Sequence, residues 1–146
     1  MGGELAIAEQ IKRDVTTALK AGDRDRVGAL RLVLSELQKA AKDGSADEQA
    51  VLRRERKRRR ESEAAYRDAG RDDLAANEAY EAGVIEAYLP AELGDDELEA
   101  LVRQAIAEIG AQGPRDMGRV IKQVMAAAAG RADGKKVSSK AKELLN

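Results

Sequence analysis

Residues 116–145 read DMGRVIKQVMAAAAGRADGKKVSSKAKELL, and this stretch decides how the C-terminal part of the chain folds. Apolar residues recur every three or four positions in both halves of the stretch, which predicts two amphipathic helices. Gly130 is expected to end the first helix as its C-cap, and Asp133 to begin the second as its N-cap. The sequence therefore predicts a tight corner between two short helices, with cations around it.

A third amphipathic helix precedes this pair, so residues 91–146 are expected to form a small three-helix domain. The acidic run 95–97 suits the start of that helix, and Pro114 suits the first position of the next one. The apolar faces are expected to be Leu98, Leu101, Val102, Ala105, Ile106 and Ile109; Met117, Val120, Ile121, Val124 and Met125; and Val137, Ala141, Leu144 and Leu145. The proline and glycine of residues 89–94 mark the boundary with an N-terminal domain.

The N-terminal domain, residues 1–90, is expected to contain four helices arranged as antiparallel hairpins. Short segments rich in glycine and aspartate separate the helical patterns. The residues expected to end or cap these helices are Gly22 and Asp23, then Ser45 or Asp47, then Gly70, and finally Pro90. The fourth helix should run until Pro90 stops it, because the residue before a proline is pushed out of the helical region. The predicted fold class is all-α throughout.

The third and fourth predicted helices carry opposite charges. Residues 53–60 hold seven cations in eight positions, whereas residues 72–99 hold ten carboxylates and no cation, so the two helices should attract each other. We expect the basic run to pair with Glu78, Glu81 and Glu86 within the chain or across a subunit contact. RNA phosphate and an acidic protein are the alternative partners for this run.

The 146 residues include neither Cys nor His, which excludes disulfides, a thiol nucleophile, an imidazole base and a Cys/His zinc site. The carboxylate pairs 72–73 and 95–96 stand at predicted helix starts, where the helix dipole explains them. We therefore expect no catalytic residue, no metal site and no cofactor. A run of 18 apolar residues and a signal-peptide pattern are both absent, so a cytoplasmic protein is expected.

The C-terminal stretch resembles the tail module of the GatB/YqeY family. The residues that carry this resemblance are Asp116, Met117, Gly118, Met125, Gly130, Ala132, Asp133 and Gly134. Residues 69–74 and 86–93 are similar to the matching segments of stand-alone YqeY-like proteins, so the resemblance covers nearly the whole chain. It implies that the C-terminal domain is GatB-tail-like.

The resemblance also implies a function. In the GatB subunit of the tRNA-dependent amidotransferases, which amidate Glu-tRNA(Gln) or Asp-tRNA(Asn), such a tail implies contact with the outer corner of tRNA. The glutaminase subunit and the kinase-like cradle of that complex have no counterpart here, so the resemblance implies a non-catalytic accessory protein that binds tRNA or a tRNA-amidotransferase complex. The cations that would make the contacts are Arg119, Lys122, Arg131, Lys135 and Lys136.

Two other functions stay open from the sequence. The first is a helical protein-interaction module that docks a partner or a second copy through its charged hairpin and binds no RNA. The second, and least favoured, is a part in a carbon–nitrogen ligase that uses glutamine as amido donor. The chain shows no nucleotide-binding motif and no activated nucleophile for such chemistry.

Overall fold

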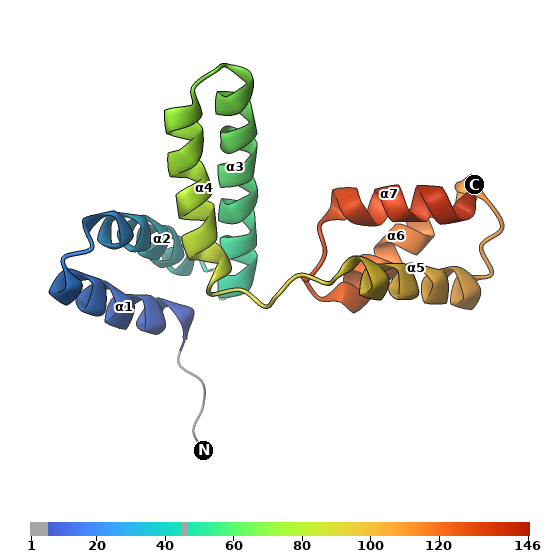
Figure 1. The fold of residues 1–146 in the computed structure, drawn as a ribbon. Helices are drawn as coiled ribbons and strands as arrows, with labels where there is room; N and C mark the ends of the chain where they lie inside the picture. Colours follow the sequence, from blue (N-terminus) through green and yellow to red (C-terminus); the bar gives the residue numbers. More distant parts are fainter. Residues whose placement is uncertain (1–5, 45–46) are drawn as a thin grey trace. The chain divides into compact units, whose positions relative to one another are not determined.

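The computed structural model describes residues 6–44 and 47–146. These residues form seven α-helices and one 3-10 helix without a strand (Figure 1), which confirms the predicted all-α fold. The chain divides into two compact units, one ending at Leu89 and the other beginning at Pro90. Each unit has its own apolar core. Ser45, one of the two predicted caps of the third helix, lies outside the described residues.

The first unit begins with a hairpin of α1 (Ile7–Ala21) and α2 (Arg24–Lys42). Gly22 ends α1 in the left-handed conformation, with φ 72°. The amides of Gly22 and Asp23 donate hydrogen bonds to carbonyls in the last turn of α1. The carboxylate of Asp23 then accepts a hydrogen bond from the Arg26 amide at 3.1 Å and so caps α2. The predicted hairpin and its two end residues are confirmed.

The N-terminus of α1 is capped from a distant part of the chain. Its N-cap residue, Ala6, makes no side-chain cap hydrogen bond. The carboxylate of Glu48 instead accepts from the amides of Ile7 and Ala8, at 2.8 and 2.9 Å. These amides have no partner within α1, so Glu48 satisfies two of the donors that every helix start leaves open.

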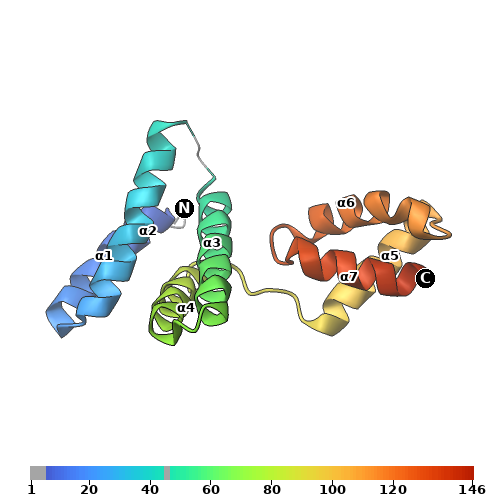
Figure 2. The ribbon, with the colours of Figure 1, turned by 90° about the horizontal axis from the view of Figure 1, so that it is seen from above.

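A second hairpin is formed by α3 (Glu48–Asp68) and α4 (Asp72–Glu86), which lie side by side in Figures 1 and 2. Asp47 caps α3 by accepting from the Ala50 amide at 3.0 Å. Gly70 has the left-handed conformation that the sequence predicts, with φ 75°, one residue after the C-cap residue Ala69. The turn between the helices is therefore confirmed with a shift of one residue.

The predicted end of α4 at Pro90 is wrong, because the helix already ends at Glu86. The amides of Tyr88 and Leu89 donate to carbonyls three residues before them, which tightens the chain into turns. The hydroxyl of Tyr88 donates to the carboxylate of Asp14 on α1. Burial and this hydrogen bond both raise the pKa of Tyr88, so the hydroxyl keeps its proton. The contact with α1 is therefore made from the turns between the end of α4 and the proline.

The core of the first unit lies where all four helices meet. Ile11, Leu30, Leu52 and Ile85, one from each helix, are fully buried in it. The residues that α3 contributes, Val51 and Leu52, belong to its first two turns. The rest of α3 therefore packs on α4 beyond this core.

The second unit contains α5 (Asp95–Ile109), the 3-10 helix η1 (Pro114–Asp116), α6 (Met117–Ala128) and α7 (Gly134–Leu145). The three α-helices pack pairwise. Their core consists of side chains on the predicted faces: Leu98, Val102, Ala105, Val120, Val124, Val137, Ala141 and Leu145. The predicted three-helix arrangement and the three apolar faces are confirmed.

Two helix starts in this unit differ in detail from the prediction. Gly94, not an acidic residue, holds the N-cap position of α5, and the carboxylates 95–97 fill the first turn. There they stabilise the helix through its dipole without a side-chain cap bond. Pro114 begins η1, and α6 follows from Met117.

Candidate nucleic-acid interface

The corner between α6 and α7 contains two consecutive left-handed residues. Ala129 is the C-cap of α6 with φ 50°, and Gly130 follows with φ 82°. The prediction of Gly130 as the cap is wrong by one residue, because Ala129 turns first. A residue with a Cβ adopts this conformation at a cost of about 1–2 kcal/mol, which contacts around the corner must offset. Asp133 caps α7 by accepting from the Lys135 amide at 3.2 Å, as predicted.

Two of the predicted RNA-binding cations make some of those contacts. The Arg131 Nε donates to the carbonyl of Ala91 at 2.8 Å, and the Arg131 carbonyl accepts from the Leu93 amide at the same distance. The Nζ of Lys136 lies 3.5 Å from the carboxylate of Glu92. Arg131 and Lys136 thus fasten the segment that leads into α5 to the corner. A phosphate would have to compete with these contacts.

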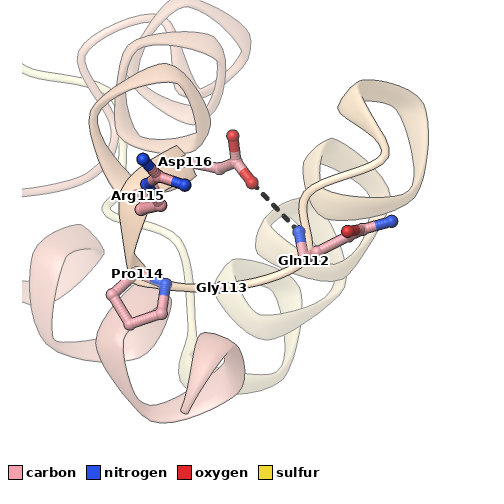
Figure 3. Close-up of a pocket in the computed structure, with 5 residues that line it drawn as sticks. All are labelled: Gln112, Gly113, Pro114, Arg115 and Asp116. Carbon is pink, nitrogen blue, oxygen red and sulfur yellow. Dashed lines mark hydrogen bonds between the residues drawn. The ribbon is translucent and has the colours of Figure 1, made fainter.

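Arg119 lies at the other end of α6 and has a partner of its own. Its Nη1 is 3.4 Å from one carboxylate oxygen of Asp116, and the pair is exposed. The other oxygen of Asp116 accepts from the Gln112 amide at 3.0 Å and closes the loop that Figure 3 shows. This loop lines a surface hollow of about 420 Å³. The spacing of three residues between Asp116 and Arg119 is a sequence signal for this pair, although the sequence analysis did not use it.

Lys122 and Lys135 are exposed. No carboxylate among the described residues pairs with either side chain, so both ammonium groups are available to an anion. Arg119 lies in the first turn of α6, about 13.5 Å along the helix axis from Ala128, where the corner begins, at 1.5 Å per residue. The structure therefore brings Arg131, Lys135 and Lys136 together at the corner, whereas Arg119 lies away from them.

The remaining motif residues pack against the core or lie in the first turns of helices. Met117, Met125 and Ala132 pack against the core of the second unit. Gly118 and Gly134 lie in the first turns of α6 and α7, and a Cβ added at either would meet nothing within 4 Å. Packing among the described residues therefore does not require glycine at these two positions.

Two of the seven cations in the basic run of α3, Arg59 and Arg60, bind the three carboxylates of α4 that the sequence predicts as partners. Arg59 forms ion pairs with Glu78 at 3.9 Å, with Glu81 at 3.2 Å, and with Glu55 of its own helix at 3.6 Å. We call the following residues the ionic cluster: Glu55, Arg59, Arg60, Glu63, Glu78, Glu81 and Glu86.

Arg60 extends the ionic cluster toward the end of α4. Its two terminal nitrogens donate to Glu63 and Glu86, each at 2.8 Å. Hydrogen bonds from Arg60 and then Arg67 hold the pKa of Glu63 below its ordinary value. The same bond to Glu86 raises the pKa of Arg60, so the cation is held firmly in its charged form.

Metal-binding side chains and membrane-spanning helices are the other features that bear on the kind of site. Within residues 6–44 and 47–146, no group of three or more Asp, Glu, His or Cys side chains is placed to hold a metal ion. Over the same residues, no helix combines the length and the apolar character needed to cross a membrane.

The fold and the corner define a small all-helical protein whose second unit is a three-helix module with a capped, cation-bearing corner. The model of the YqeY-like protein family matches residues 8–145. The chain therefore belongs to the YqeY-like family, which confirms the resemblance found in the sequence. No curated protein sequence gives a match to the chain.

Proposed function

We propose that this protein is a non-catalytic accessory protein that binds tRNA, alone or within a tRNA-amidotransferase complex, through the α6–α7 corner. The resemblance of residues 116–134 to the GatB tail supports the link to tRNA, and the cations near the corner supply the means of binding. Such cations bind the phosphate backbone and make binding strongly dependent on salt.

One observation carries the proposal, namely the exposed ammonium group of Lys135 in the first turn of α7, which no described carboxylate pairs. The first turn of a helix presents amides without intrahelical partners and the positive end of the dipole. A cation there disfavours the helix by a few tenths of a kcal/mol, so helix stability does not explain Lys135. A phosphate bound at the corner would use Lys135 and the amides that Asp133 does not cap.

The test is tRNA binding by fluorescence anisotropy at 50 to 200 mM salt. The test variant, Lys122→Ala with Lys135→Ala, removes two exposed charges and leaves the contacts of Arg131 and Lys136 intact. Each phosphate contact contributes about 0.7–0.9 to the slope of log affinity against log salt, so the slope should fall by about 1.5. The matched control, Lys20→Ala with Lys42→Ala, removes two exposed lysines from the first unit and should bind like the wild type.

Three results would contradict the proposal. The first is the absence of tRNA binding by the wild-type protein at 50 mM salt. The second is equal binding by the test variant and the wild type. The third is glutamine- or ATP-dependent turnover by the purified chain, which would contradict the non-catalytic role.

A further inference from the structure

The first unit carries cations that the ionic cluster does not use. Arg53, Arg54 and Lys57 have no ion-pair or hydrogen-bond partner among the residues that the structure describes. Arg58 pairs with Glu55 at 2.9 Å, but its side chain is 70% exposed. We call these four residues the α3 basic face.

The four side chains share one side of the helix. Positions 53, 54, 57 and 58 fall within an arc of about 140°, because each residue turns the helix by about 100°. This arc is opposite the arc that holds Glu55, Arg59 and Glu63, which face α4 or are buried. Figures 1 and 2 show that α4 covers one side of α3 only. The ionic cluster therefore neutralises the inner side of α3 and leaves three of the four cations of the α3 basic face, Arg53, Arg54 and Lys57, without a carboxylate partner among the described residues.

The spacing of these charges suits a polyphosphate. Four cations lie within about 7.5 Å of helix axis, from five steps of 1.5 Å. A nucleic-acid duplex carries about one negative charge per 1.7 Å of its axis, which is a similar density of the opposite sign. Like charges four residues apart, as at 53 and 57 or 54 and 58, repel by about 0.2–0.5 kcal/mol in the free helix. A bound polyanion would relieve that repulsion.

The α3 basic face lacks what a protein partner needs. Protein interfaces are centred on buried apolar or aromatic side chains. The large apolar side chains exposed on the described residues are Leu19, Leu32 and Tyr80, which lie on α1, α2 and α4. Arginine, by contrast, offers several donors that match phosphate oxygens. The face thus favours a nucleic-acid backbone over a protein.

We propose that the α3 basic face is a second phosphate-binding surface, which contacts the backbone of a double-helical stem of the RNA. The inference rests on the proposed tRNA binding and adds a contact surface in the first unit. Glu61 is the next exposed side chain along this side of α3, so its carboxylate bounds the surface.

The experiment measures tRNA affinity against salt for the wild type and three variants. The face variant carries Arg53→Gln, Arg54→Gln and Lys57→Gln. The corner variant carries Lys122→Ala and Lys135→Ala. The control carries Arg13→Gln, Arg24→Gln and Arg31→Gln, which removes three exposed cations of α1 and α2. Circular dichroism checks that each variant keeps the helical content of the wild type, and Lys57→Gln alone serves as a milder variant.

We expect the face variant to lower the salt slope by about 2–3 and Lys57→Gln to lower it by about 1, while the control matches the wild type. A face variant that binds like the control, when the wild type binds tRNA, overturns this inference and leaves the proposed function standing. Loss in the face variant together with an unaffected corner variant supports this inference and overturns binding at the corner. Failure of the wild type to bind overturns both.

A competition measurement addresses the kind of polyanion. An RNA hairpin should displace bound tRNA at a lower concentration of charge than polyglutamate does. Equal displacement by the two polyanions would overturn the assignment to RNA.

Discussion

The α3–α4 hairpin and the α5–α7 unit are both built from helices rich in alanine, yet different forces hold them together. In the α5–α7 unit, Val102, Val120, Val124 and Val137 are fully buried against one another. In the hairpin, beyond the first two turns of α3, Arg59 and Arg60 bind carboxylates of α4. One all-helical chain therefore contains one region that depends on apolar burial and another that depends on charge.

The difference has a physical consequence for how each region is specified. Apolar side chains tolerate many neighbours, whereas a partly buried cation destabilises the fold unless a carboxylate lies beside it. A slip of α4 by one turn would separate Arg59 and Arg60 from their partners. The ionic cluster therefore fixes the alignment of the hairpin, and apolar volume fixes the packing of α5, α6 and α7.

The largest effect is expected from Leu98→Ala, which tests the apolar side of the comparison. Leu98 is 4% exposed, and removing a buried leucine side chain costs about 2–5 kcal/mol. This is a large part of the stability of so small a unit. Hydrogen exchange followed by mass spectrometry should show α5, α6 and α7 losing protection while α3 and α4 keep theirs. Leu32→Ala, at a side chain that is 48% exposed, is the control. Equal loss in both variants would contradict the apolar account.

The next effect is expected from Arg59→Met, which tests the charged side. Arg59 contacts three carboxylates and its side chain is 22% exposed. Its removal takes this cation from Glu78 and Glu81 and leaves Glu55 with Arg58 alone, at a cost of about 1–3 kcal/mol after allowance for partial exposure. Urea unfolding should detect the loss, and 0.5 M NaCl should reduce the difference from the wild type.

The matched control for that prediction is Arg58→Met. Arg58 carries the same charge on the same helix, but its side chain is 70% exposed and its partner Glu55 also pairs with Arg59, so its removal should cost about 0–1 kcal/mol. If both variants lost equal stability, the ionic cluster would not be what holds the hairpin.

A smaller loss of stability is expected at low pH, where Glu63 becomes protonated. The lowered pKa of Glu63 means that folding favours its charged form. Its contribution is complete above the ordinary value of 4.5 and is lost as the pH falls through the lowered pKa of the folded state. Between pH 7 and 3, Glu63→Gln should lose less stability in urea unfolding than the wild type does. Glu61→Gln, at an exposed carboxylate of the same helix, should follow the wild type. Parallel curves for all three proteins would show that Glu63 makes no such contribution.

The smallest effect is expected from replacing one glycine in each region by alanine. Gly83 lies inside α4 and Gly118 in the first turn of α6, and a Cβ at either would meet nothing within 4 Å. Gly83→Ala should therefore stabilise the protein by about 0.5–1 kcal/mol through helix propensity. Gly118→Ala should give less, because it lies at a helix end. Thermal unfolding measures both, and a loss of stability in Gly83→Ala would be the contrary result.

Local rules predicted most of the fold. The left-handed glycines at 22 and 70, the aspartate caps at 23, 47 and 133, and the three apolar faces of the second unit all depend on neighbours within a few residues. The pairing of α3 with α4 was also predictable, because opposite charges lie on consecutive helices. Each of these features is visible in a short window of sequence.

What the sequence did not predict depends on distant residues. Tyr88, just beyond the early end of α4, donates to Asp14 of α1. Arg131 and Lys136 contact the segment 91–93. A short window of sequence contains neither partner, so it could not predict these contacts.

The cap that Glu48 provides for α1 also sets an order of events. The amides of Ile7 and Ala8 find their acceptors in a residue made about forty positions later. At a synthesis rate of about 5–20 residues per second, the start of α1 waits on the order of 2–8 s on the ribosome before that carboxylate exists. The α1–α2 hairpin must therefore begin folding with one frayed end, and the arrival of α3 completes it.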